Sequence, residues 1–270
     1  MNLLTVEGIS KSFGDKKIFD DITFGIDEGD RIGLIGINGT GKSTLLKIVA
    51  GNESADSGQI VKKNGLRIGY LPQTPDFDPE DTVLGQVFNC DSPVINLIKE
   101  YEQAVREVEL TGSEESQKAL YALNDKMDAA DAWNIENDAK TILTKLNIPD
   151  LYKKAGTLSG GQLKRMALAR ALITPVDLLI LDEPTNHIDN DSVEWLEKYL
   201  AKYKGALLMV THDRYFLDRI VNKTLELDEA RLYSYTTNYS GFLEAKAERE
   251  ELAAAAERKR RKFLRTEIEW

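Results

Sequence analysis

Gly36-Ile37-Asn38-Gly39-Thr40-Gly41-Lys42-Ser43 is the stretch that decides the fold. It fits the pattern G-x-x-x-x-G-K-[ST] at every position, and glycines in this pattern let backbone N–H groups approach a phosphate closely. Residues 31–35 can form a strand before the loop, and residues 43–50 can open a helix after it. A strand, a glycine-rich loop and a helix in this order predict an α/β domain whose helix N-terminus faces phosphate groups.

Two residues of this loop carry side chains suited to a nucleotide. We expect Lys42 to reach the β- and γ-phosphates and the Ser43 hydroxyl to contact Mg²⁺. The alternative is a glycine-rich turn with an incidental Lys-Ser pair. The strand and helix expected on either side of the loop argue against that alternative.

A second segment places two acids at the end of a strand. Residues 176–181 are apolar except for Asp177, which predicts a buried parallel strand, and Leu181-Asp182-Glu183-Pro184-Thr185-Asn186-His187-Ile188-Asp189 follows. Ligands bind at the carboxyl edge of such strands. We therefore expect Asp182 to hold a hydrated metal ion and Glu183 to polarise a water molecule.

A third segment, Leu158-Ser159-Gly160-Gly161-Gln162, precedes a predicted amphipathic helix at 163–172. Ser159 can cap this helix, and Gly160 and Gly161 leave its first N–H groups uncovered. The residues expected on one side are Leu163, Met166, Ala167 and Ala171, with Lys164 and Arg165 on another. Since the domain already has a phosphate loop, this second helix end is expected to serve a nucleotide held by another domain. The alternative is an ordinary capped helix.

With these motifs in this order, residues 1 to about 235 resemble the ATP-binding cassette (ABC) ATPases. The resemblance implies an α/β P-loop NTPase fold with a helical subdomain, ATP and Mg²⁺ as cofactors, and hydrolysis of ATP. The nucleotide-binding residues that it implies are Phe13, Gly36, Asn38, Gly39, Thr40, Gly41, Lys42, Ser43, Thr44, Ser159, Gly160, Gly161 and Gln162. The metal-binding residues that it implies are Ser43, Gln73 and Asp182. The catalytic residues that it implies are Glu183 as base, His212, Gln73 and Lys42. Asp189 matches the aspartate of the family's D-loop.

Three of these assignments have competing interpretations. Gln73 could be an ordinary loop residue, although it stands between the first and third motifs. His212 follows an apolar run that predicts a strand, where a lone histidine is usually structural; its place in the motif order favours the family's switch histidine. Phe13 matches the residue that stacks on adenine, but Phe19 and Phe24 compete for that role.

Composition limits the class of protein. A chain of 270 residues suits one large domain, or a domain with an appendage. No apolar run reaches the ~18 residues that cross a bilayer, the first residues resemble a strand rather than a signal peptide, and the single cysteine, Cys90, excludes an internal disulfide. We expect a cytoplasmic protein without a membrane partner. The net charge of −10 excludes a uniformly basic nucleic-acid binder but allows a local basic patch.

The chain divides into a cassette and an extension. We expect a nucleotide-binding domain at 1–235, with a helical subdomain at about 74–157 that contains an arm-like insertion near 91–131. The insertion is expected because the segment is longer than a plain transporter ATPase needs. From Tyr239 onward, residues that favour helices continue without glycine or proline after Gly241, which predicts one long C-terminal helix within a charged linker at 236–270.

The residues around His187 narrow the resemblance. Thr185-Asn186-His187-Ile188-Asp189 resembles the ABC-F branch, whose soluble members carry two cassettes in one chain and act on ribosomes, and the linker resembles the Uup-type subgroup. This implies a second cassette as partner, and a ribosome whose rRNA and tRNA are reached by the arm and the basic linker. Because the chain carries one cassette, we expect a fragment of a longer protein that hydrolyses ATP slowly by itself. The alternatives are the cytosolic ATPase subunit of an ABC transporter and a DNA-repair or chromosome-type ABC ATPase, which would need a long coiled coil.

The linker contains a dense basic cluster. Residues 257–265 hold six basic residues and one acidic residue. Such clusters bind nucleic acid through phosphate contacts, but they also occur as solvated helix faces. Phe263 and Trp270 could stack on a base or pack against protein. The sequence therefore allows RNA contact or a charged helix folded against its own cassette.

Overall fold

The computed structural model describes residues 1–89, 92–148 and 150–268, and it describes side chains as far as residue 258. Cys90, Phe263, Trp270 and most of the basic cluster therefore lie outside the described side chains. Among the described residues, no helix is both long and apolar enough to cross a membrane.

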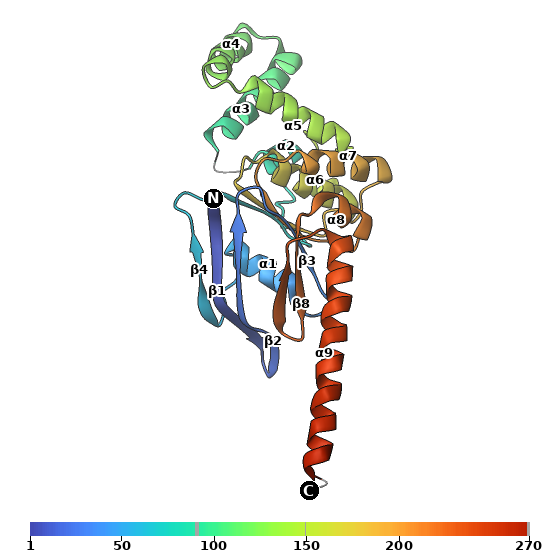
Figure 1. Cartoon of the computed structure of the whole chain (residues 1–270). Coiled ribbons are helices and arrows are strands. Elements are labelled where there is room, and N and C mark those ends of the chain that lie inside the picture. Colours follow the sequence, from blue (N-terminus) through green and yellow to red (C-terminus); the bar gives the residue numbers. More distant parts are fainter. Residues whose placement is uncertain (90–91, 149, 269–270) are drawn as a thin grey trace.

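A six-stranded sheet forms the centre of the molecule (Figure 1). Its order is β5-β6-β7-β3-β8-β9, in which the first five strands are parallel and β9 is antiparallel to β8. The strands are β5 Ile68–Leu71, β6 Leu178–Asp182, β7 Ala206–Val210, β3 Arg31–Ile35, β8 Lys223–Asp228 and β9 Arg231–Tyr235. Because β3, β6 and β7 are parallel neighbours, their carboxyl ends bring the phosphate loop, the acid pair and the His212 loop to one edge.

Successive residues of the parallel strands face two different cores. Ile180 and Leu208 pack into a core with Leu46 of α1 Lys42–Ala50, whereas Leu181 and Met209 belong to the core under the helices. The first core is closed by an antiparallel sheet in the order β2-β1-β4. These strands are β1 Asn2–Phe13, β2 Lys16–Asp27 and β4 Ser57–Lys62. Burial of the sheet on both faces explains why its central strands β6 and β7 are almost entirely apolar.

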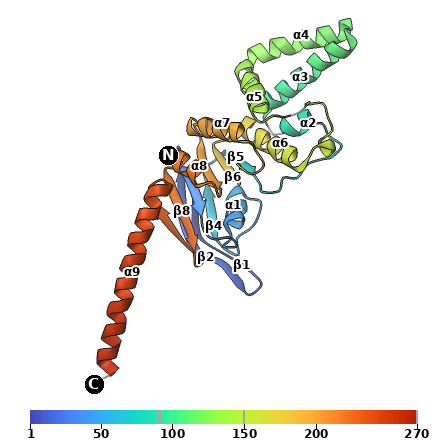
Figure 2. The ribbon, with the colours of Figure 1, turned by 90° about the vertical axis from the view of Figure 1, so that its right-hand side faces the viewer.

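Helices cover the second face and extend beyond it (Figures 1 and 2). They are α2 Val83–Val87, α3 Pro93–Thr111, α4 Glu114–Ala129, α5 Trp133–Lys145, the 3₁₀ turn η1 Ala155–Thr157, α6 Gly160–Ile173, α7 Asn190–Ala201 and α8 Arg214–Ile220. Helices α3 and α4 form a hairpin that stands away from the sheet, in the region where we predict the arm. The predicted long C-terminal helix is present as α9, Tyr239–Ile268.

Two local predictions were wrong. The strand expected at 176–181 is β6 Leu178–Asp182, so Asp182 ends the strand, and Asp177 precedes it in an ion pair with Arg67 at 2.8 Å. The helix expected to be amphipathic is α6, whose residues 166–169 are all buried. Lys164 and Arg165 are only partly exposed. The reason is that α2, α5 and β5 all pack on α6, so it has no broad solvent face.

Candidate active site

The phosphate loop between β3 and α1 is held closed by its own residues. The Thr40 hydroxyl donates to the Ile37 carbonyl at 2.9 Å, and Lys42 Nζ donates to the Gly36 carbonyl at 2.9 Å and the Ile37 carbonyl at 3.0 Å. Glycine is required at Gly41, where φ is +96° and a Cβ would lie 2.1 Å from Ile18 Cγ2. The loop's own hydrogen bonds and its glycine conformation therefore define its shape.

The N-terminus of α1 is open to an anion. Its N-cap residue is Gly41 in the left-handed conformation, and no side chain caps the helix. The first N–H groups of the helix thus lack the partner that most helices provide, which suits phosphate binding. The predicted residues Asn38 and Gly39 are exposed on the loop, while Ser43 and Thr44 lie in the first turn.

Asp182 is the end residue of β6 and has the environment of a metal ligand. Its exposed fraction is 3%, and neither of its carboxylate oxygens has a hydrogen-bond partner among the described residues. Burial raises the pKa of Asp182, while the nearby Ser43 hydroxyl and the Lys47 and Lys42 ammonium groups favour its charged form. Ser43 and Asp182 thus provide a hydroxyl and an unpaired buried carboxylate, which are ligands that Mg²⁺ accepts alongside phosphate oxygens and water.

Glu183 follows Asp182 in a strained conformation and faces His212. Its φ is +55°, which is uncommon for a residue with a side chain and occurs often at functional sites. His212 Nε2 lies 3.3 Å from Glu183 Oε1, and the His212 backbone N–H donates to Glu183 Oε2 at 3.3 Å. Burial raises the pKa of Glu183, and His212 partly opposes this. A buried carboxylate with a raised pKa, next to an imidazole, can accept a proton from water.

The loops that carry Glu183 and His212 are joined by hydroxyl groups. Thr185 Oγ1 and Thr211 Oγ1 are hydrogen-bonded at 3.0 Å. Thr211 Oγ1 also accepts from the Asp213 backbone N–H, and Asp213 caps α8 through the Phe216 N–H at 3.0 Å. The sequence indicated His212 but not this hydrogen bond, because Thr185 and Thr211 are 26 residues apart and meet only in the folded chain.

Lys42 links the loop to the acids. Burial lowers its pKa, and the charges of Glu183 and Asp182 act in the opposite direction. Gln73 is exposed just beyond β5 and lines a small cavity with Asp182 and Glu183. The structure therefore brings Lys42, Gln73, Asp182, Glu183 and His212 to one edge of the sheet.

The predicted signature loop is well formed but separate from the phosphate loop. Ser159 Oγ accepts from the Gln162 N–H at 3.3 Å, and Gln162 Oε1 accepts from the Ser159 N–H at 2.9 Å. The predicted cap by Ser159 is confirmed. Gln162 completes a capping box, which the S-x-x-Q spacing could have indicated and which we did not predict. None of the hydrogen bonds or ion pairs of the described residues joins 159–162 to the phosphate loop. Gly160 and Gly161 lie at the start of α6 as expected.

The three candidate aromatics differ in exposure. Phe19 and Phe24 are 0% and 7% exposed, so both are core residues and cannot stack on a base. Phe13 is 53% exposed at the end of β1, and Lys11 Nζ lies 5.5 Å from its ring centroid. Phe13 is therefore the one of the three whose ring is open to a ligand, and adenine stacking stays a prediction.

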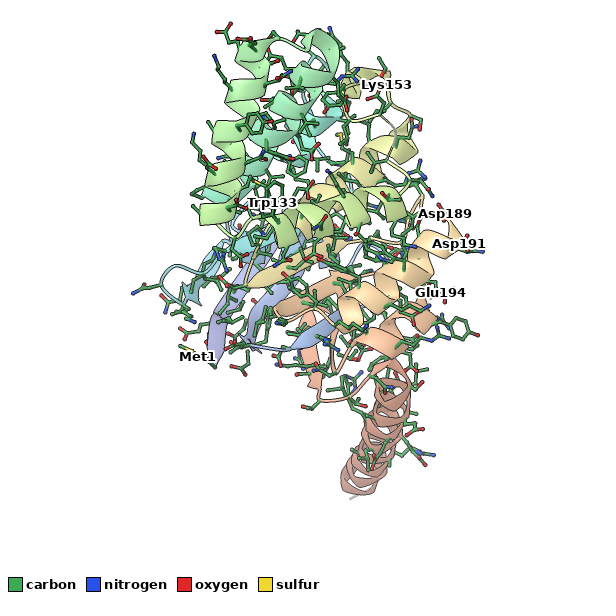
Figure 3. All side chains as sticks on the ribbon, turned by 90° about the horizontal axis from the view of Figure 1, so that it is seen from above. Met1, Trp133, Lys153, Asp189, Asp191 and Glu194 are labelled. Carbon is green, nitrogen blue, oxygen red and sulfur yellow. The ribbon has the colours of Figure 1, made fainter. Side chains whose placement is uncertain are left out.

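Asp189, which Figure 3 labels, is the N-cap residue of α7 and also contacts residues of two neighbouring segments. It caps α7 by accepting from the Ser192 N–H at 2.9 Å, which lowers its pKa. Asn147, just beyond α5, donates to Asp189 Oδ2 at 3.2 Å, and Arg165 of α6 lies 4.0 Å from the same oxygen. The matched D-loop aspartate is thus tied to the helical region by two residues that we did not predict, since their contacts arise from packing.

Comparison with known proteins agrees with this geometry. The sequence model of the ABC transporter family matches residues 19–186, and a second model with the same description matches residues 225–270. The chain is 49% identical over its whole length to an uncharacterized ABC transporter ATP-binding protein, YfmR, of Bacillus subtilis, and covers 43% of that protein. It is 38% identical over 99% of its length to the energy-dependent translational throttle protein EttA of Mycobacterium tuberculosis and covers 48% of it.

The chain thus spans about half the length of the curated relatives it matches. A solved ATP-binding subunit of an ABC transporter has the same fold, with a TM-score of 0.64 at 22% identity over 87% of this chain and 90% of that one. The predicted α/β P-loop fold is confirmed. The chain therefore belongs to the ABC transporter family, as an ATP-binding cassette domain of the ATPases whose members hydrolyse ATP.

Proposed function

We propose that this chain is the ATP-hydrolysing cassette of an ABC-F protein, of the Uup-like type, that acts on ribosomes in the cytoplasm. The observation that carries the ATPase part is the buried Glu183 paired with His212, beside an uncapped helix end and the unpaired carboxylate of Asp182. If Asp182 and Glu183 had only a structural role, both carboxylates would be expected to have hydrogen-bond donors.

Phosphate binding, Mg²⁺ binding and activation of water would be carried out by different residues of the site. The loop N–H groups and Lys42 bind the β- and γ-phosphates, for which Lys42 must leave the Gly36 and Ile37 carbonyls. Ser43 and Asp182, with Gln73 nearby, would hold Mg²⁺, which when bound supplies positive charge against the developing negative charge of the phosphates. Glu183 orients a water molecule and accepts its proton.

A second cassette would complete this site. The chain carries one phosphate loop and one signature loop, and no described hydrogen bond or ion pair joins them. We propose that 159–162 closes on nucleotide held by another cassette. Although Ser159 caps α6, Gly160 and Gly161 have no side chains to cover the first N–H groups of the helix. The length of the relatives, about twice that of this chain, supports a second cassette in the whole protein.

The relatives and the appended helices support the ribosome as partner. A relative that covers nearly all of this chain is named a translational throttle protein. The α3–α4 hairpin and α9 both project from the cassette (Figures 1 and 2). The hairpin carries eight acidic and four basic residues, so its charge suits a basic protein surface better than RNA. We therefore assign RNA contact to the basic part of the linker alone, whereas the sequence resemblance implied RNA contact by the arm as well.

Co-sedimentation of the whole protein tests this proposal. Glu183→Gln should retain MgATP and hold the closed state, and the variant should pellet with ribosomes in an ATP-dependent manner. Lys42→Ala in the same background is the control, because it should lose nucleotide and ribosomes together. Association with membranes instead of ribosomes would favour a transporter subunit and reject the ribosomal role.

A further inference from the structure

Glu226 is a buried carboxylate that none of the motifs explains. It lies on β8 with an exposed fraction of 3%. Lys246 of α9 forms an ion pair with Glu226 Oε1, and Arg249 Nη2 of α9 lies 3.0 Å from Oε2. The Tyr235 hydroxyl is 3.3 Å from Oε2. Both oxygens of one buried acid are thus held by cations from the helix that follows the cassette.

Arg249 is also fixed by aromatic residues of β9. Its guanidinium lies 3.8 Å from the centroid of the Tyr233 ring and donates to the Tyr235 hydroxyl at 2.6 Å. Phe242, which precedes Lys246 and Arg249 in α9, is buried and packs edge-on against Tyr235, with 5.2 Å between the ring centroids. We call Glu226, Tyr233, Tyr235, Lys246 and Arg249 the α9 clamp.

The clamp holds only the first part of α9. Residues 251–254 are exposed, and Figures 1 and 2 show α9 starting beside β8 and then extending away from the body. The clamp is therefore the point at which the direction of the helix is set. A small rotation there moves the far end of a 30-residue helix by a large distance.

The clamp lies directly beside the phosphate loop. In the parallel register of β3 and β8, Glu226 is opposite Ile35, the residue before Gly36. The Leu227 carbonyl packs so closely on Gly36 that a Cβ there would lie 2.5 Å from it. A cavity of about 390 Å³ is lined by both groups, including Gly36, Lys42, His212, Glu226 and Lys246.

We propose that Glu226 is a positioning residue that links the orientation of α9 to nucleotide binding at the phosphate loop. By holding Lys246 and Arg249, Glu226 keeps β8 and the Leu227 carbonyl against Gly36, so movement of the loop around phosphate is transmitted to the helix. The inference rests on the proposed function only in that the loop binds MgATP. Thermodynamic linkage then makes the effect reciprocal. If bound nucleotide stabilises the docked position of α9 by a given factor, releasing α9 weakens nucleotide binding by the same factor.

The test compares Glu226→Gln and Arg249→Gln with the unchanged 270-residue chain. Two quantities are measured: amide hydrogen exchange of residues 239–250, and the Kd for Mg-AMPPNP, a non-hydrolysable ATP analogue. In the unchanged chain, Mg-AMPPNP should slow exchange of this segment. In either variant, exchange should be faster, Kd should rise about fivefold or more, and the nucleotide should no longer slow exchange. Arg249→Lys retains the charge and should restore part of both effects.

Glu248→Gln is the matched control. Glu248 is exposed on the same helix, and no ion pair is found for it among the described residues. Its substitution removes one negative charge, as Glu226→Gln does. It should leave exchange and Kd unchanged. Arg249→Gln tests the clamp without altering β8, because Arg249 lies on α9 and is partly exposed. The test therefore holds even where Glu226→Gln does not fold.

The outcomes separate the two proposals. If the unchanged chain does not bind Mg-AMPPNP, the proposed function fails. If it binds and the clamp variants bind equally well with a loosened α9, the link between the helix and the loop is rejected. If α9 is not loosened in either variant, the clamp itself is rejected.

Discussion

Asp182 shows at the scale of one residue how a binding site costs stability. Its carboxylate oxygens are buried with no hydrogen-bond partner of good geometry among the described residues, and burial raises its pKa despite the nearby Ser43 hydroxyl. The folded state then binds more protons than the unfolded state between the two pKa values, so stability falls as pH rises through this range. The penalty is present above the folded-state pKa and is lost as pH falls below it.

Asp182→Asn should therefore stabilise the nucleotide-free protein. We expect a gain of about 1 kcal/mol in the free energy of unfolding at pH 7, because the amide carries no charge to desolvate. The measurement is urea denaturation at pH 7 and at pH 5. The gain should shrink at pH 5, and the same variant should lose Mg²⁺-dependent binding of nucleotide. A loss of stability at pH 7 would show that Asp182 has partners in the folded state.

The raised pKa of Glu183 has a consequence for the pH dependence of hydrolysis. A base must be ionised, and burial keeps Glu183 protonated to a higher pH than an ordinary glutamate, whose pKa is about 4.3. The acid limb of the profile of kcat/KM for ATP should thus lie above that value and be absent in Glu183→Gln, which should be almost inactive. An acid limb at or below the ordinary value would argue against Glu183 as the base.

Among the elements, α6 carries the signature loop on a capped start. Ser159→Ala removes the cap and should cost about 1 kcal/mol of stability. It should also slow hydrolysis in the two-cassette protein, since the loop is proposed to close on nucleotide. Ser113→Ala is the control, because Ser113 caps α4 in the same way through the Ser116 N–H at 3.1 Å. Equal effects of both substitutions on hydrolysis would contradict the role of 159–162.

The elements also show what could be predicted from the sequence. The phosphate loop follows β3 and His212 follows β7 as predicted, because each position depends on a local pattern after a strand. The acid pair was predicted to follow a strand, but Asp182 is the last residue of β6. The solvent exposure of α6 was not predicted correctly, since it depends on α2, α5 and β5. Glu226 gave no signal, because its burial arises when Lys246 and Arg249, about 20 residues later, fold onto it.

At the scale of the whole molecule, the chain has a nucleotide site at the carboxyl edge of the sheet and two appended helical elements that leave the cassette in different directions (Figure 1). The α9 clamp connects one of them to the site. The site is proposed to be half of a composite site, since no hydrogen bond or ion pair of the described residues joins 159–162 to the phosphate loop.

The most direct test of this claim is the rate of ATP hydrolysis per molecule of the 270-residue chain over a wide range of protein concentration, with Glu183→Gln as the measure of contaminating activity. We predict that the chain binds MgATP, hydrolyses it slowly when dilute, and gains activity per molecule as two copies begin to associate. Rapid hydrolysis that is independent of protein concentration would contradict the claim, because one cassette would then complete the site alone.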